Sequence, residues 1–285
     1  MAAVAMLTAT LLGSAQDGGV PQAGCRCAHC AAALADREFE RLPASLALRG
    51  PDGVQLFEAT RELAHQLALA GGGTPAAVWL THAHLGHIDG LGQFGTEVMD
   101  ARGVPFHCSR AVAEQLRATP GWRALLDGCH LELREWRSGE PVECRGFSVT
   151  PLPVPHRDER SDMHALLVSA KRKLLFLPDH DDWGATLAAV GAASPRDWFR
   201  QLGADIVLLD GTFWSADELP RQDAVPHPPV RESLERLGTR RKGDPRIVFI
   251  HLNHTNPLCN PESAESAKLA RSGWETGREG QTFSI

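Results

Sequence analysis

Three histidines within six residues constrain this chain more than any other feature of its sequence. The stretch THAHLGHIDG directly follows an apolar run, residues 76–80, which predicts a buried strand. His82 and His84 are two positions apart, so at a strand end their side chains point to the same side. The turn at Gly86 can bring His87 in from another direction. Because buried imidazole nitrogens require hydrogen bonds or a metal ion, the spacing predicts a metal centre rather than a histidine-rich surface loop.

The same arrangement, an apolar strand with a histidine or an aspartate just past its end, recurs along the chain. The further expected strands are 147–154, 174–177, 206–209 and 247–250, and they precede His156, Asp179, Asp210 and His251. One such residue at a strand end is usually a cap or a turn residue. Five strand ends together predict one rim of a sheet where metal ligands gather. We also expect a hairpin around residues 50–53 and helices over 61–70 and 111–126, the second broken near Pro120.

Three of the seven cysteines crowd into the motif CRCAHC, at Cys25, Cys27 and Cys30. The odd number and the crowding argue against a disulfide framework and favour metal binding in a reducing compartment. A closed structural zinc site needs four ligands. We expect His29 to point away from the cluster, so the fourth ligand comes from elsewhere in the chain. Three free buried cysteines are the alternative.

Composition excludes several classes of protein. The formal charge of −6 argues against nucleic acid or an anionic membrane as the main partner. No apolar run approaches the ~18 residues of a membrane span. Residues 1–15 resemble a signal peptide but lack a positive n-region, so we expect residues 7–12 to form a first buried strand and the protein to be cytoplasmic.

The chain is predicted to form a single domain over residues 1–285, because it has no internal repeats and no low-complexity linkers. A segment rich in proline and arginine, residues 215–245, is expected to be an insertion that covers the site. A homodimer is left open as an alternative to a monomer.

The order of the histidine and aspartate motifs resembles the metallo-β-lactamase fold superfamily, over most of the chain from about Leu7 to Pro257. Within that superfamily, three stretches are similar to the pyrroloquinoline quinone biosynthesis protein B branch: GSA through CRCAHC, DGTFWSADEL and TNP. The phosphonate-pathway cyclic phosphodiesterases share the cysteine cluster and a closing His-x-x-His. The resemblance implies an α/β fold, a four-layer αβ/βα sandwich with the metal site on one edge.

The resemblance also implies a ligand set with three histidines for a first metal, two for a second metal and a bridging aspartate. These residues are His82, His84 and His156, then His87 and His251, and Asp179 as the bridge. By similarity to the phosphodiesterases, His254 would complete the cysteine cluster as a structural zinc site. The expected cofactors are thus one or two divalent metals in the active site, with zinc first and iron or manganese as alternatives, and one structural zinc.

The chain departs from the superfamily pattern at Gly86, where the family has an aspartate that binds the second metal and orients the nucleophilic water. A single metal or a weakly held pair is therefore open. Asp17, Asp89 or Asp210 could supply the missing carboxylate, and Asp17 ranks first because its glycine-flanked loop follows the first strand. The biosynthesis branch differs in the other direction, since it lacks the first two histidines of the motif, so its oxidative chemistry does not carry over.

The leading hypothesis is a metal-dependent hydrolase, in which a metal-bound hydroxide attacks a phosphodiester, a lactone or a thioester in a small-molecule or peptide substrate. We expect Asp179 and Asp17 to act in catalysis, together with His227, which the stiff loop VPHPP can present to the site. Arg157 could pair with a phosphate or carboxylate of the substrate. Trp214, with its aromatic neighbours, could line the pocket, although aromatic residues after strands are more often core.

Two other classes of function remain open. An iron-dependent oxygenase acting on a peptide or amino-acid precursor, in cofactor or natural-product biosynthesis, would use the same histidine and carboxylate ligands with open positions on ferrous iron. A non-catalytic binding protein on a decayed scaffold is the third class, and Gly86 is the residue that motivates it.

Overall fold

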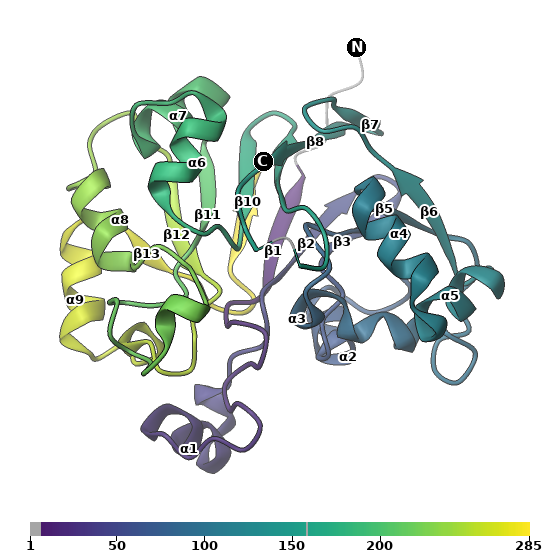
Figure 1. Ribbon diagram of the computed structural model, residues 1–285, viewed down its shortest axis with the longest axis horizontal. Helices are drawn as coiled ribbons and strands as arrows, with labels where there is room; N and C mark the ends of the chain where they lie inside the picture. Colours follow the sequence, from purple (N-terminus) through teal and green to yellow (C-terminus); the bar gives the residue numbers. More distant parts are fainter. Residues whose placement is uncertain (1–6, 158) are drawn as a thin grey trace.

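The computed structural model describes residues 7–157 and 159–285, which form two seven-stranded sheets packed face to face (Figure 1). The first sheet has the order β14-β1-β2-β3-β4-β5-β6. Its strands are β1 (Thr8–Gly13), β2 (Ser45–Gly50), β3 (Gly53–Phe57), β4 (Ala77–Trp79), β5 (Val104–Cys108), β6 (Leu131–Glu135) and β14 (Thr282–Ser284). The second sheet has the order β13-β12-β11-β10-β9-β8-β7. Its strands are β7 (Val142–Cys144), β8 (Phe147–Pro153), β9 (His164–Ser169), β10 (Lys173–Leu177), β11 (Ile206–Asp210), β12 (Arg246–Ile250) and β13 (Glu275–Thr276).

Helices cover the outer face of each sheet. On the first sheet these are α2 (Leu63–Leu69), α3 (Leu85–Ile88), α4 (Arg110–Ala118) and α5 (Pro120–Asp127). On the second they are α6 (Trp183–Val190), α7 (Pro195–Leu202), α8 (Val230–Leu237) and α9 (Ala264–Arg271). The helix α1 (Ala28–Ala35) stands apart from both layers at the bottom of Figure 1. Four short 3-10 turns complete the described elements: η1 (Arg37–Phe39), η2 (Asp89–Phe94), η3 (Gln222–Ala224) and η4 (Pro257–Cys259). The expected four-layer αβ/βα sandwich is confirmed.

Strands near the middle of both sheets are apolar on both faces, because one face meets the other sheet and the opposite face meets helices. Phe57, Trp79 and Phe176 lie in the core between the sheets and are fully buried. Val78 and Phe106 are buried in the first outer core, between the first sheet and α2, α4 and α5. Val207 and Phe249 are buried in the second outer core, between the second sheet and its helix layer. The continuous apolar runs in the sequence therefore mark strands that are covered on both sides.

The predicted elements correspond closely to the observed ones. The hairpin is confirmed as the antiparallel pair β2 and β3. The long helix is interrupted as expected, since α4 ends at Ala118 and Pro120 is the first residue of α5, a position where proline costs no hydrogen bond. The first strand is confirmed as β1, whereas residues 1–6 of the segment compared with a signal peptide lie outside the described residues. In the part of the chain that the structure describes, every helix is too short or too polar to cross a membrane.

The segment 215–245 contains both a loop and a helix of the outer layer. Its first half includes η3, and its second half includes α8, whose apolar side is buried in the second outer core through Val230, Leu234 and Leu237. The helix α8 is thus part of the packed fold. That segment 215–245 is an insertion covering the site stays a prediction.

Packing of α8 can be tested by shortening one of its buried side chains. Leu237 is 1% exposed, so Leu237→Ala should lower the free energy of unfolding by about 2–5 kcal/mol through lost burial and a residual cavity. Glu235→Ala on the exposed side of the same helix is the matched control and should stay within about 0.5 kcal/mol of wild type. Chemical denaturation followed by circular dichroism measures both. Equal stability of the two variants would contradict the placement of α8 in the core.

Candidate metal centre

The side chains predicted to bind metal meet at one rim because they follow strands that run in the same direction. In the second sheet β10, β11 and β12 are parallel, and β8 has the same direction because it is antiparallel to β9, which is antiparallel to β10. In the first sheet the same relation links β1, β3 and β4. The residues just past these strand ends therefore converge, as ligands do at the carboxyl ends of strands in open α/β sheets.

The first group of ligands consists of His82, His84 and His156, which are all buried. The Nε2 atom of His82 lies 2.9 Å from the Nδ1 atom of His84. One ring nitrogen from each of the three histidines lies within 4.8 Å of the other two, a separation that a single metal ion can span. The structure therefore brings the predicted first-metal residues together.

The second group consists of Asp17, His87 and His251, with Asp179 beside them. The Nε2 atom of His87 lies 3.4 Å from Asp17 Oδ1 and 3.3 Å from Asp179 Oδ2. The Nε2 atom of His251 lies 3.5 Å from Asp17 Oδ1 and 3.4 Å from Asp179 Oδ1. Since Asp179 Oδ1 is also 3.9 Å from the Nε2 atom of His156, Asp179 stands between the two groups, where a bridging ligand has to be.

Oxygen acceptors on the far side of the rings hold several histidines in place. The pairs are Thr81 Oγ1 with His82 Nδ1 at 2.9 Å, Asp181 Oδ1 with His156 Nδ1 at 3.1 Å, and Thr212 Oγ1 with His251 Nδ1 at 2.8 Å. Each contact uses the outer nitrogen of a ring and leaves Nε2 facing the centre. Such outer partners are the usual means by which proteins orient metal-binding histidines.

The inward-facing atoms fit a divalent metal. His156 Nε2, His251 Nε2 and Asp179 Oδ2 are buried, and none has a hydrogen-bond partner among the described residues. Unpaired buried polar atoms are costly, and a metal ion would satisfy all three. Burial, followed by repulsion from the His87 charge, holds the pKa of His82 well below its usual value, so its ring is neutral and can donate a lone pair.

Gly86 is small because Asp17 fills the space beside it. A Cβ atom added at Gly86 would lie 2.2 Å from Asp17 Cγ, far inside van der Waals contact. Burial raises the pKa of Asp17, but the nearby imidazoles of His251 and His87 outweigh burial and hold the pKa well below its usual value, so the group is a carboxylate. A carboxylate from the loop after β1 thus takes the place that the superfamily pattern gives to the residue before the third histidine.

The two other carboxylates considered for this role lie elsewhere, so those alternatives are wrong. Asp89 Oδ2 is 2.7 Å from the Nη2 atom of Arg61 in a partly exposed ion pair. Asp210 is buried, and both of its oxygens already accept hydrogen bonds: Oδ1 from Thr212, and Oδ2 from the His180 backbone N–H and from His227. Asp210 is therefore an outer partner of the site, although its strand end predicted a ligand.

His227 lies at the site, where the stiff proline-flanked loop places it. Its Nδ1 atom is 2.8 Å from Asp210 Oδ2 and 3.9 Å from Asp179 Oδ1, and its ring packs against the ring of His251 at 5.6 Å between centroids. Burial lowers the pKa of His227, but the Asp210 carboxylate, which also accepts a hydrogen bond from it, outweighs burial and the pKa is raised. A raised pKa favours the protonated form of the ring, which can act as an acid.

Glu58 lies next to His87 in the site, although the sequence patterns did not identify it. It is fully buried at the end of β3, with the left-handed φ of 67° that non-glycine residues rarely adopt. One carboxylate oxygen accepts a hydrogen bond from the Thr81 backbone N–H at 3.3 Å, and the other lies 3.7 Å from His87 Nδ1. A charged residue directly after an apolar run was the available signal, identical in kind to the one that identified the aspartates.

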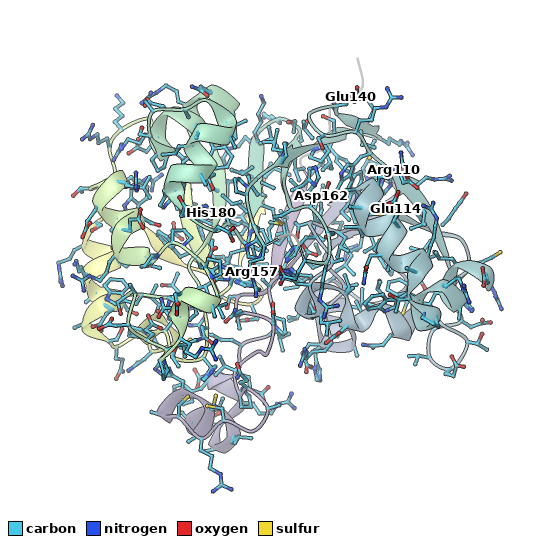
Figure 2. All side chains as sticks on the ribbon, in the orientation of Figure 1. Arg110, Glu114, Glu140, Arg157, Asp162 and His180 are labelled. Carbon is cyan, nitrogen blue, oxygen red and sulfur yellow. The ribbon has the colours of Figure 1, made fainter. Side chains whose placement is uncertain are left out.

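The two residues predicted to bind substrate have different surroundings. Arg157 lies close to the middle of the molecule in Figure 2, at the rim next to His156. Its Nη1 atom is 3.6 Å from Glu159 Oε1, and the same oxygen is 3.4 Å from His84 Nε2. Trp214 instead packs in the second outer core, with the Lys268 ammonium 5.8 Å from its ring centre. Its burial favours the alternative named for Trp214, a core residue, and the substrate-binding role stays a prediction.

The cysteine cluster acquires a fourth ligand from the other end of the chain. The Nδ1 atom of His254 lies 3.4 Å from the Sγ atoms of both Cys25 and Cys27, and Cys30 belongs to the same group. His29 turns its Nδ1 to the backbone oxygen of His254 at 2.9 Å rather than joining the group. Three thiols and one imidazole at these distances match the donor set of a closed structural zinc site.

Comparisons with known proteins agree with this geometry. The family model described as β-lactamase superfamily domain matches residues 50–252. Coenzyme PQQ synthesis protein B of Cupriavidus taiwanensis is 30% identical over 318 residues, covering 98% of this chain and 100% of that protein.

Two solved structures share the fold. The zinc-bound crystal structure of PqqB from Methylobacterium extorquens superposes with a TM-score of 0.76 at 21% identity, over 98% of this chain and 100% of the other. A diphosphatase from the PhnP family superposes with a TM-score of 0.70 at 20% identity, over 98% of this chain and 97% of the other. The resemblance inferred from the motifs is thereby confirmed. The chain belongs to the β-lactamase superfamily of metal-dependent enzymes and, within it, to the family of coenzyme PQQ synthesis protein B.

Proposed function

We propose that this chain is a metal-dependent hydrolase acting on a phosphodiester, lactone or thioester bond. The observation that carries the proposal is the rim where one carboxylate, Asp179, lies between two groups of histidines. There the buried atoms His156 Nε2, His251 Nε2 and Asp179 Oδ2 have no hydrogen-bond partner among the described residues. A divalent metal bound there lowers the pKa of a water to roughly 7 and polarises the bond under attack. Zinc suits these ligands, and iron and manganese are alternatives.

The chain's own residues supply the remaining parts of the reaction. The Asp17 and Asp179 carboxylates both lie beside His87, on the side where the attacking water would lie, so they would orient that water. His227, kept protonated by Asp210, is placed to give a proton to the leaving group. Arg157 at the rim can bind an anionic group of the substrate, since a guanidinium matches the geometry of phosphate and carboxylate.

An iron-dependent oxygenase is the second candidate, and similarity to coenzyme PQQ synthesis protein B favours it. Histidines and a carboxylate with open positions can hold ferrous iron. His82 and His84 argue for the hydrolase, because they complete the hydrolytic motif of the superfamily. A non-catalytic scaffold loses its motivation, since Asp17 occupies the position that Gly86 leaves free.

Metal analysis of anaerobically purified protein tests the hydrolase directly. The wild type should contain active-site metal and hydrolyse bis(p-nitrophenyl) phosphate, a lactone or a thioester, and a chelator followed by added metal should remove and restore that activity. His84→Ala should lose active-site metal and activity while keeping the metal of the cysteine cluster. Turnover of none of these three ester classes would contradict the proposal, and iron-dependent oxygen uptake would support the second candidate.

The acid role of His227 predicts a dependence on the leaving group. His227→Asn should lower kcat by about 10²–10⁴-fold for an alkyl ester, which needs a proton on departure, and much less for a p-nitrophenyl ester. The metal content should equal that of wild type. Equal losses for both leaving groups, or a loss of metal, would show that His227 acts as a ligand or a structural residue instead.

The exchange between Gly86 and Asp17 predicts a reciprocal pair of variants. Gly86→Ala should displace the Asp17 carboxylate and weaken the second active-site metal at least about tenfold, because one ligand is lost. Gly92→Ala is the matched control, since no atom lies within 4 Å of its added Cβ. The double variant Asp17→Gly with Gly86→Asp should recover affinity. Competitive titration with a chromophoric chelator measures all three, and normal affinity in Gly86→Ala would contradict the assignment.

A further inference from the structure

We propose that the metal held by the cysteine cluster sets the affinity of the active site for its second metal. The reason is that the same two loops carry ligands from both sets. The first loop, residues 14–27, contains Asp17 and Cys25, and the second loop, residues 251–256, contains His251 and His254. The inference rests on the second-metal role proposed above for Asp17 and His251.

The ligands of the cysteine cluster and of the second active-site metal lie close together along each loop, so they cannot move independently. His251 and His254 are separated by two residues only, so a shift of one imidazole moves the backbone that carries the other. Asp17 lies within a turn that is closed by a 2.8 Å hydrogen bond from the Gly19 backbone N–H to Gln16 O. Cys25 and Cys27 follow this turn along the same loop.

Backbone hydrogen bonds join the two loops next to the second-metal ligands. The Gln16 backbone N–H donates to Leu252 O at 2.9 Å, and the Leu252 backbone N–H donates to Ser14 O at 2.9 Å. Together with the parallel bridge between Ala15 and Leu252, they form a short ladder. Asp17 follows this ladder directly on one loop and His251 precedes Leu252 on the other, so the register of the loops sets the distance between the two ligands.

The cysteine cluster is the second connection between the loops, and it depends on a metal. Cys25 and Cys27 come from the end of the first loop and meet His254 of the second loop at 3.4 Å. Without a metal, thiol-to-imidazole contacts of this kind are weak hydrogen bonds. With a metal, they become bonds of a closed site that can contribute folding free energy.

Asp17 is the ligand most sensitive to such a change. Its side chain is 38% exposed, whereas those of His87, His251 and Asp179 are at most 3% exposed and held by core packing. The position of Asp17 therefore depends mainly on its loop. The backbone pairing of Val20 with Arg41, at 2.8 Å in both directions, holds part of this loop independently of the cluster. We accordingly expect weakened binding of the second metal rather than its complete loss.

A pair of cysteine variants tests this coupling. Cys27→Ser removes one thiolate of the cluster, and Cys144→Ser removes a half-buried thiol from β7 as a matched control. The electron paramagnetic resonance of free Mn²⁺ measures the affinity of the weaker active-site metal position. This affinity should fall about 10-fold in Cys27→Ser, which is the size of effect typical when the outer partners of metal ligands are disturbed. It should stay unchanged in Cys144→Ser. Unchanged affinity in a Cys27→Ser protein that has lost its cluster metal would overturn the proposal.

The wild-type chain provides a second arm in case Cys27→Ser does not fold. One equivalent of Cd²⁺, which prefers thiolates, is added to the metal-free protein, and Mn²⁺ affinity is measured with and without it. Filling the cluster should strengthen the second site about 10-fold, and equal affinities would overturn the coupling. Asp17→Ala distinguishes failure of the coupling from failure of the proposed function. This variant should weaken binding of the second metal even if the cysteine cluster has no influence. No effect of Asp17→Ala would refute the role of Asp17 as a ligand.

Discussion

The structure depends on a rim of imidazole and carboxylate groups that are buried together without enough partners of their own. His156 Nε2, His251 Nε2 and Asp179 Oδ2 face one another in the middle of the molecule with no hydrogen-bond partner among the described residues. Such an arrangement is unfavourable in a metal-free protein and favourable around a divalent ion. The strand directions of both sheets, the outer oxygen partners of the histidines and the loops above the rim all serve to hold these atoms in place.

The second metal position shows how one chemical role can move between segments of a chain. The superfamily pattern has a carboxylate at the residue before His87, and here the Asp17 carboxylate, from the loop after β1, lies 3.4 Å from the Nε2 atom of His87. The two solutions exclude each other, because a side chain at Gly86 would overlap the Asp17 carboxylate. In the proposed arrangement, the second metal depends on a loop that the cysteine cluster also uses, whereas the first metal depends on strand ends buried in the core.

Several roles could be predicted from sequence and several could not, and particular residues show why. Asp179 and Asp210 follow parallel strands in the same way, yet only Asp179 faces the metal groups, because Asp210 is occupied by Thr212 and His227. Trp214 looked like a pocket residue and is a core residue, since an aromatic side chain after a strand can turn to either side. Glu58 was overlooked, and its left-handed backbone is visible only in three dimensions.

The sequence by itself determined most strands and most candidate ligands, because apolar runs of strand length and histidine spacing are local properties of the chain. The layer architecture was implied by the resemblance of these motifs to the metallo-β-lactamase superfamily. Tertiary structure decided among the three candidate carboxylates by placing Asp17 against Gly86, and it showed His254, which only the family resemblance had suggested, at the cysteine cluster. Both depend on contacts between segments far apart in the chain, and the distance between such segments is set by how the two sheets pack and not by any local pattern.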